Sequence, residues 1–213
     1  MRYIDCFNHF FPKGLWDKML STPGAVADIG ARMRGVPAIY DLDRRRQVCD
    51  MFNKRRDYKQ VISLGMPPLE ALGTPKQVED FAKLGNDGMA ELCAKYPDYF
   101  CGWLASLPMN SKNAAREAER AFKNGACAVQ IHTNINGKPL DLPEFRPVFE
   151  VCAKQGKAVF LHPSRGAFDL ADYKTEKKSK YEIWWTFGWP YETSVAMARL
   201  VFGGVMDEFK IGR

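Results

Sequence analysis

Short apolar runs alternate with stretches of helical periodicity along most of the chain. Five runs rich in β-branched or aromatic residues predict buried strands, over Tyr3–Phe7, Gln60–Leu64, Tyr99–Leu104, Ala126–Ile131 and Ala158–Leu161. Between them, apolar residues at helical spacing predict helices over Asp41–Arg56, from Thr74 onward, and over Lys112–Lys123, Pro143–Gln155 and Pro190–Phe209. Because buried strands joined by helices pair in parallel, the pattern predicts an α/β fold around a parallel sheet.

Two connections are much longer than the others. They run from His9 to Tyr40 and from Pro163 to Trp189, and each follows the carboxyl end of a predicted strand. Ligands of parallel α/β folds bind at that edge, and long loops there often carry function. The second connection is dense in aromatic residues, namely Trp184, Trp185, Phe187 and Trp189. Its aromatic side chains either pack on one another or form the wall or lid of a pocket.

The composition narrows the class of protein. With 213 residues, 46% hydrophobic and 26% charged, the chain is an ordinary globular protein, which excludes disordered, collagen-like and coiled-coil classes. The net charge of +6 suits a small anionic partner such as a carboxylate or phosphate. The basic runs, Arg44–Arg46, Arg55–Arg56 and Lys177–Lys178, are predicted to be solvated faces. We therefore expect no nucleic-acid partner, with anion or nucleic-acid binding through Arg44 to Arg56 as a remaining alternative.

The cysteines and the first residues of the sequence indicate the cellular compartment of the protein. The six cysteines include no pair closer than eight positions, so no metal or redox Cys-x-x-Cys motif is present. The first residues do not read as a signal peptide, and no apolar run approaches the ~18 residues that span a bilayer. These features predict a reduced, cytoplasmic protein without a membrane partner.

The histidines are the main candidates for chemistry. There are only three, His9, His132 and His162, and they follow the first, fourth and fifth predicted strands. Imidazole is the commonest metal ligand and the usual proton carrier near neutral pH. For His9 and His162 this position favours a ligand or catalytic role over a structural one. For His132 a catalytic role and a structural core role both remain open.

The alternation of side chains orients the first strand. With a period of two, Asp5, Phe7 and His9 share one face, whereas Cys6 and Asn8 share the other. If the sheet closes into a barrel, the first set faces inward and His9 lies nearest the mouth.

Several segments together resemble a known family. The opening Ile4-Asp5-Cys6-Phe7-Asn8-His9-Phe10-Phe11-Pro12 is similar to the first strand of the amidohydrolase superfamily, in particular its aminocarboxymuconate-semialdehyde-decarboxylase-like branch. Further resemblance lies in Val129–Asn134 with Gly137–Asp141, in Val159–Pro163, and in Glu192-Thr193 followed by Leu200–Gly204. The resemblance covers nearly the whole chain, and the combination of motifs is more specific than any one of them.

The resemblance implies both a fold and an activity. The fold is a (β/α)8 barrel with one divalent metal, zinc or manganese, at its C-terminal mouth, and this chain would supply about the first five βα units. The implied reaction is non-oxidative decarboxylation of a small aromatic or unsaturated carboxylic acid, with a hydrolase or hydratase of the same superfamily as the alternative. His9 and His162 correspond to metal ligands, and a homodimer is expected.

Three further residues are candidates for the substrate side of this site. Arg165 lies three positions after His162, and its planar guanidinium suits bidentate binding of a substrate carboxylate. The competing interpretation is an arginine on a surface loop. Trp185 is a candidate substrate-binding residue and His132 a candidate catalytic residue.

The chain departs from the family pattern in two ways. Phe7 stands where the family has its first metal ligand, and a phenyl ring cannot bind a metal, so a non-catalytic relative is a second alternative. A closed barrel typically has ~250 residues, so residues 1–213 are predicted to be a single barrel domain shortened after residue 209. The family's later catalytic histidine and ligand aspartate belong to its sixth and eighth strands.

Overall fold

The sheet follows the order of the sequence. The computed structural model describes residues 1–22, 33–165 and 171–211. The chain divides into two compact units, residues 1–130 and 131–213. Five strands form one sheet in the order β1-β2-β3-β4-β7, and the pairs β1–β2, β2–β3 and β3–β4 are parallel. The predicted α/β fold is confirmed. Parts of both long connections, residues 23–32 and 166–170, lie outside the described residues.

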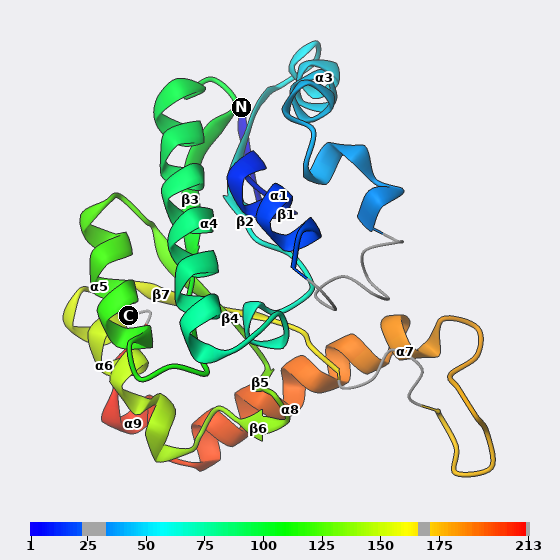
Figure 1. The fold of residues 1–213 in the computed structure, drawn as a ribbon, viewed down its shortest axis with the longest axis vertical. Helices are drawn as coiled ribbons and strands as arrows, with labels where there is room; N and C mark the ends of the chain where they lie inside the picture. Colours follow the sequence, from blue (N-terminus) through cyan, green and yellow to red (C-terminus); the bar gives the residue numbers. More distant parts are fainter. Residues whose placement is uncertain (23–32, 166–170, 212–213) are drawn as a thin grey trace. The chain divides into compact units, whose positions relative to one another are not determined.

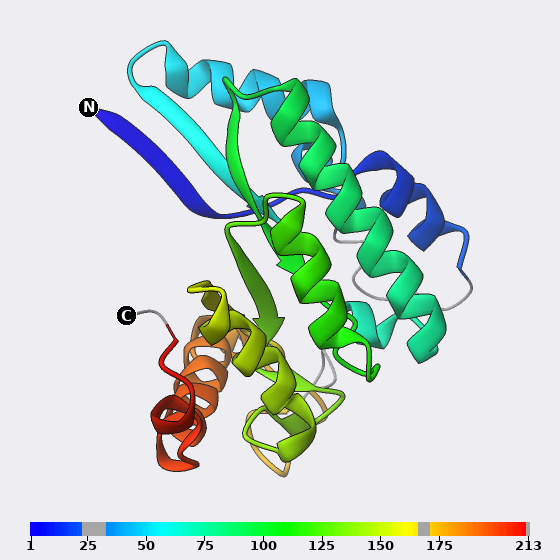
Figure 2. The same ribbon diagram turned by 90° about the vertical axis from the view of Figure 1, so that its left-hand side faces the viewer.

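The first unit contains strands β1 to β3 and the helices that pack on them. Figures 1 and 2 show β1, β2 and β3 side by side, with the long helix α4 running along them. Its elements are β1 (Arg2–His9), α1 (Lys13–Leu20), η1 (Pro37–Ile39), α3 (Leu42–Asn53), β2 (Asp57–Ser63), η2 (Leu69–Ala71), α4 (Pro75–Lys95), β3 (Phe100–Ser106), α5 (Ala114–Lys123) and the start of β4 (Ala128–His132). Within the described ranges, no helix is both long and apolar enough to cross a membrane.

Two helices of this unit begin at side-chain caps. Asp41 accepts hydrogen bonds from the backbone N–H groups of Asp43 and Arg44 at the start of α3. Thr74 and Gln77 form a reciprocal capping box at the start of α4, where Pro75 occupies the first helical position. Both caps fall at or next to the predicted starts, because they depend only on residues that are close in sequence.

The last predicted helix, in the second unit, is divided in two. It contains the end of β4, β5 (Asn134–Ile135), β6 (Lys138–Pro139), η3 (Pro143–Phe145), α6 (Arg146–Lys154), β7 (Ala158–His162), α7 (Ile183–Thr186), α8 (Gly188–Phe202) and α9 (Val205–Glu208). A single helix over Pro190–Phe209 was wrong, because Gly204 adopts a φ of 75° and separates α8 from α9.

A bulge in β1 changes which side chains share a face. Asp5 pairs with Gln60, but Asn8 pairs with Ile62, so one extra residue is inserted in β1 between these positions. Paired residues of parallel strands point to the same side of the sheet. His9 pairs with Ser63 and is therefore on the opposite face from Asp5. The prediction that Asp5 and His9 share a face was wrong, because strict alternation cannot anticipate a bulge.

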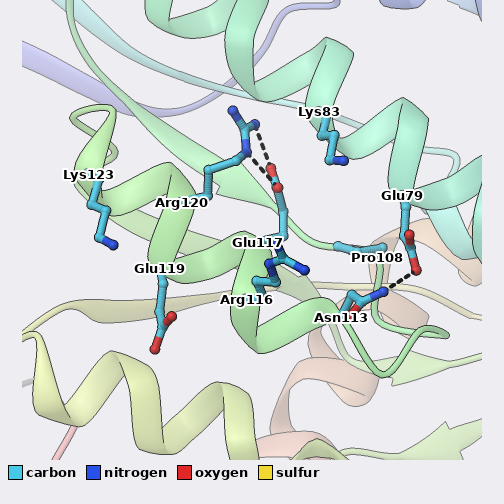
Figure 3. A pocket seen from close by; sticks show the side chains of 9 residues that line it. All are labelled: Glu79, Lys83, Pro108, Asn113, Arg116, Glu117, Glu119, Arg120 and Lys123. Atoms are coloured by element: carbon cyan, nitrogen blue, oxygen red, sulfur yellow. Dashed lines mark hydrogen bonds and ion pairs between the residues drawn. The ribbon is translucent and has the colours of Figure 1, made fainter.

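A buried polar network joins α4, α5 and β3. The side chain of Asn86 in α4 is fully buried; it accepts a hydrogen bond from the Ser106 N–H at 2.9 Å and donates to the Ser106 carbonyl at 2.9 Å. It also donates to Glu117 Oε1 at 2.7 Å. Glu117 in turn accepts two bonds from Arg120. Figure 3 shows this pair beside a cavity of about 370 Å³ between α4 and α5.

Candidate active site

His9 ends β1 with its tautomer determined by its neighbours. Its Nδ1 lies 3.1 Å from Ser63 Oγ, and that hydroxyl lies 3.0 Å from the carbonyl oxygen of Asn8. A carbonyl can only accept, so the single hydroxyl hydrogen of Ser63 is donated to Asn8. Ser63 Oγ must then accept from Nδ1–H of His9. A neutral His9 therefore carries its lone pair on Nε2.

Close packing also restricts the His9 imidazole. A methyl group at Gly65 would lie 3.0 Å from His9 Cγ, so only glycine lets the ring rest there without a shift. The ring of Phe7 meets that of His9 edge-on, with 5.5 Å between centroids. Phe7 itself is 55% exposed. Arg45 of α3 donates a hydrogen bond to the His9 carbonyl.

His162 ends β7 in the corresponding tautomer. It is 1% exposed, and its Nδ1 lies 2.8 Å from the carbonyl oxygen of Pro163, which can only accept. Nδ1 therefore carries the hydrogen and Nε2 the lone pair. Burial lowers the pKa of His162, and the hydrogen bond to Pro163 opposes this only in part. Burial consequently favours the neutral imidazole.

The second unit brings His132 and the aromatic cluster to His162. The buried His132 ring lies 5.0 Å from that of His162, and the Trp189 indole meets His162 edge-on at 5.7 Å. Trp189 also contacts Trp185 at 4.5 Å, so the cluster packs on itself and reaches the histidine pair. The packing of the aromatic side chains on one another is thus observed, and their role as the wall or lid of a pocket stays a prediction. The Nε1–H of Trp189 is buried without an acceptor among the described residues.

Arg165 has a carboxylate of its own chain beside it. Its Nε lies 3.4 Å from Glu192 Oε1, an ion pair without hydrogen-bond geometry. Its guanidinium packs on Gly188, where a methyl group would lie 2.6 Å from one terminal nitrogen. Burial raises the pKa of Glu192, and Arg165 opposes that rise. The sequence placed Glu192 in a family-like segment but offered no signal that it would pair with Arg165.

The two histidines fit a divalent metal as donors. An ion binds neutral imidazole through a nitrogen lone pair, and His9 and His162 each carry that lone pair on Nε2. Phe7 contributes no donor. Among residues 1–22, 33–165 and 171–211, no group of three His, Cys, Asp or Glu side chains has a metal-binding arrangement. By its tautomer each of the two histidines, taken by itself, is suited to donate to a metal ion, whereas Phe7 is not.

Glu70 is a buried acid that the sequence did not single out. It lies in η2, after the carboxyl end of β2, and burial raises the pKa of its carboxyl to about 7 from an ordinary 4.5. Below pH 4.5 the carboxyl is neutral in both the folded and unfolded states. Between pH 4.5 and 7 only the unfolded state ionises, so folding stability falls as the pH rises.

Substitution of Glu70 should therefore flatten the pH dependence of stability. We expect the wild-type chain to lose on the order of 3 kcal/mol of unfolding free energy between pH 4.5 and 7 through this group. Glu70→Gln, which stays neutral, should lose less over the same interval. Urea unfolding at pH 5 and pH 8 measures the difference, and parallel pH profiles for the two proteins would contradict the burial of a protonated carboxyl.

Comparison with known proteins identifies the family. The amidohydrolase family model matches residues 4–210. A 2-amino-3-carboxymuconate-6-semialdehyde decarboxylase of Dictyostelium discoideum is 36% identical over 135 residues, which are 62% of this chain and 36% of that protein. A gamma-resorcylate decarboxylase of Rhodococcus jostii is 30% identical over 215 residues, which are 94% of this chain and 61% of that protein. The chain thus spans less than two thirds of these relatives.

Solved structures support the fold. The 5-carboxyvanillate decarboxylase of Sphingomonas paucimobilis superposes with a TM-score of 0.79 at 24% identity, over 98% of this chain and 65% of that one. A dihydroxybenzoic acid decarboxylase of Polaromonas sp. JS666, solved with manganese and the inhibitor 2-nitroresorcinol, gives 0.75 at 24% identity, over 99% and 63% of the two chains. The chain belongs to the amidohydrolase family, in its aminocarboxymuconate-semialdehyde-decarboxylase-like branch, as the motifs around His9 and His162 predict.

Proposed function

We propose that the protein is a metal-dependent, non-oxidative decarboxylase of a small aromatic carboxylic acid. The observation that carries this proposal is the shared tautomer of His9 and His162. Each ends a strand of the sheet, and each has a backbone or hydroxyl acceptor on Nδ1 that leaves its lone pair on Nε2. The three relatives cited are named as decarboxylases, two of them of hydroxylated aromatic acids.

In this proposal His9 and His162 hold the ion through Nε2. A bound zinc or manganese ion would act as a Lewis acid that orients the substrate carboxylate and a neighbouring oxygen. Ser63 and Pro163 would hold the two imidazoles in the required tautomer, as outer-shell partners do in other metal sites. The edge of Phe7 against His9 would restrict motion of that ring.

The remaining residues would act on the substrate. Arg165 would bind the substrate carboxylate, or its guanidinium would be oriented by the ion pair with Glu192. Trp185 would help to form the wall of the substrate pocket. The buried Nε1–H of Trp189 is a further donor for a substrate oxygen. When the bond to the carboxyl carbon breaks and carbon dioxide leaves, the electron pair stays on the ring carbon and takes up a proton. His132, packed on His162, is the candidate acid–base residue.

The activity is tested by carbon dioxide release. We expect the 213-residue chain with added Mn²⁺ or Zn²⁺ to convert 2,6-dihydroxybenzoate or 5-carboxyvanillate to the phenol and carbon dioxide. Chromatography of the phenol and trapping of carbon dioxide measure the reaction, with chelator-treated protein as the control. Water uptake without carbon dioxide release would instead favour the hydrolase or hydratase alternative. The homodimer implied by the family resemblance stays a prediction.

A non-catalytic role is the second candidate, and Phe7 is the observation that favours it. A phenyl ring replaces one expected donor, and no group of three metal-binding side chains occurs within the described ranges. A binding or regulatory relative would take up aromatic acids without releasing carbon dioxide. Calorimetric binding of 2,6-dihydroxybenzoate in the absence of any turnover would support this candidate over the enzyme.

A further inference from the structure

Arg45 is a buried cation whose hydrogen-bond acceptors are all neutral. Arg45 lies in α3, and only 6% of the residue is exposed. Nε donates to the Ala38 carbonyl at 2.7 Å, one terminal nitrogen lies 3.4 Å from Gln60 Oε1, and the other donates to the His9 carbonyl. No carboxylate of the described ranges lies within ion-pair distance of it. The guanidinium also lies over the Phe10 ring, 5.7 Å from its centroid.

Such a placement is costly for a side chain that merely fills space. Burial of an ion without a close counter-ion costs several kcal/mol, and an apolar side chain of similar volume would avoid that cost. Burial lowers the pKa of Arg45 for the same reason. Hydrogen bonds link Arg45 to the carboxylate of Asp5 only through other side chains, since Gln60 donates to Tyr58, whose hydroxyl donates to Asp5. The cost indicates that the multiple donors of the guanidinium have a specific use.

The specific use of the Arg45 donors is seen at the point where β1 leaves the sheet. The N–H of Phe10 still donates to Ser63 at 2.8 Å, but the N–H of Phe11 donates to Ile39 of η1 instead. The carbonyl of His9 accepts from Arg45. Arg45 and η1 therefore anchor the backbone at the carboxyl end of β1, while Ser63 and Gly65 of the neighbouring strand and loop hold the His9 ring.

We propose that Arg45 is a positioning residue for His9. By binding the His9 carbonyl from α3, it fixes the end of β1 and the direction in which the imidazole is presented. This holding of the ring follows from contacts within the first unit alone. Its consequence for metal affinity rests on the proposed function.

The test compares two substitutions of Arg45 with a matched control. Arg45→Met keeps much of the side-chain volume and removes every hydrogen-bond donor. Arg45→Lys keeps the charge but can donate to only some of the three acceptors. Arg44→Met removes an exposed arginine of the same helix, which donates a hydrogen bond to Gln47. Nitrogen-15 spectra of the histidine rings report tautomer and order at His9, with His162 as an internal reference.

We expect the Nδ1–H signal of His9 to be lost or broadened in Arg45→Met, and reduced in Arg45→Lys. The signals of His162 should be unchanged in both, and Arg44→Met should resemble the wild type throughout. If either Arg45 variant is folded and keeps the wild-type His9 signal, the proposal is wrong. If neither variant folds, Arg45 is a structural anchor of α3 and the positioning role is rejected.

Titration with Mn²⁺ alone provides the second readout. Loss of an outer-shell partner typically lowers metal affinity by about 10–100-fold, and we expect a loss of this size in Arg45→Met. His9→Ala measures the effect of removing the ring itself. If His9→Ala weakens binding but Arg45→Met does not, positioning fails while the metal role stands. If the wild type binds no Mn²⁺ while its His9 signal still depends on Arg45, the metal proposal fails and the positioning role stands.

Discussion

Replacement of His162 by alanine should lower the affinity for Mn²⁺ by more than the ~10–100-fold that follows loss of an outer-shell residue. The reason is that burial favours the neutral ring and that the Pro163 carbonyl orients it so that Nε2 holds the lone pair. Calorimetric titration of the metal-free full chain with Mn²⁺ measures the change.

His132→Ala is the matched control for that experiment. It removes a buried imidazole of the same unit, so both variants create a cavity, but only one removes a proposed ligand. We expect His132→Ala to keep its Mn²⁺ affinity within about 10-fold and to lose decarboxylation by about 10²–10⁴-fold. Equal loss of metal affinity in the two variants would mean that a general disturbance of the site, rather than ligation by His162, causes the effect.

Asn86→Ala should be among the most destabilising single substitutions in the first unit. The fully buried amide makes three hydrogen bonds, to both backbone groups of Ser106 and to Glu117. Each buried partner left without a hydrogen bond costs about 1–3 kcal/mol, so we expect a loss of roughly 3 kcal/mol or more. At ~2–4 °C per kcal/mol for a protein of this size, the melting temperature should fall by about 6–12 °C.

Asn86→Asp separates hydrogen bonding from loss of volume. It keeps the size of the side chain but replaces the donor by an acceptor that faces the Ser106 carbonyl and Glu117. If the amide acts through its hydrogen bonds, this variant should be at least as unstable as Asn86→Ala at neutral pH. A milder effect would indicate that filling of the cavity dominates. Asn113→Ala, which removes a partly buried bond to Glu79, should cost only about 1 kcal/mol.

The order of strands and helices could be predicted because it depends on local periodicity. The parallel sheet, the caps at Asp41 and Thr74, and the placement of all three histidines at strand ends follow from residues near one another in sequence. The motif around His9 likewise indicated the family before any geometry was known. The predicted elements differed from the structure at local irregularities of the backbone, such as the break between helices at Gly204.

The details of the site could not be predicted, because they depend on residues far apart along the chain. Ser63 determines the tautomer of His9 from 54 positions away, and Arg45 reaches the same residue from 36 positions away. Glu192 meets Arg165 only because α8 folds back toward the end of β7.

The sequence by itself therefore determined the α/β class, the family and the two candidate metal-binding histidines. The tertiary structure alone decided the face on which His9 lies, since the bulge between Asp5 and Asn8 is visible only in the pairing of β1 with β2. It also decided the tautomers and the support of the rings. The physical reason is that hydrophobic periodicity is a property of neighbouring residues, whereas a hydrogen bond to an imidazole requires a partner that folding brings beside it.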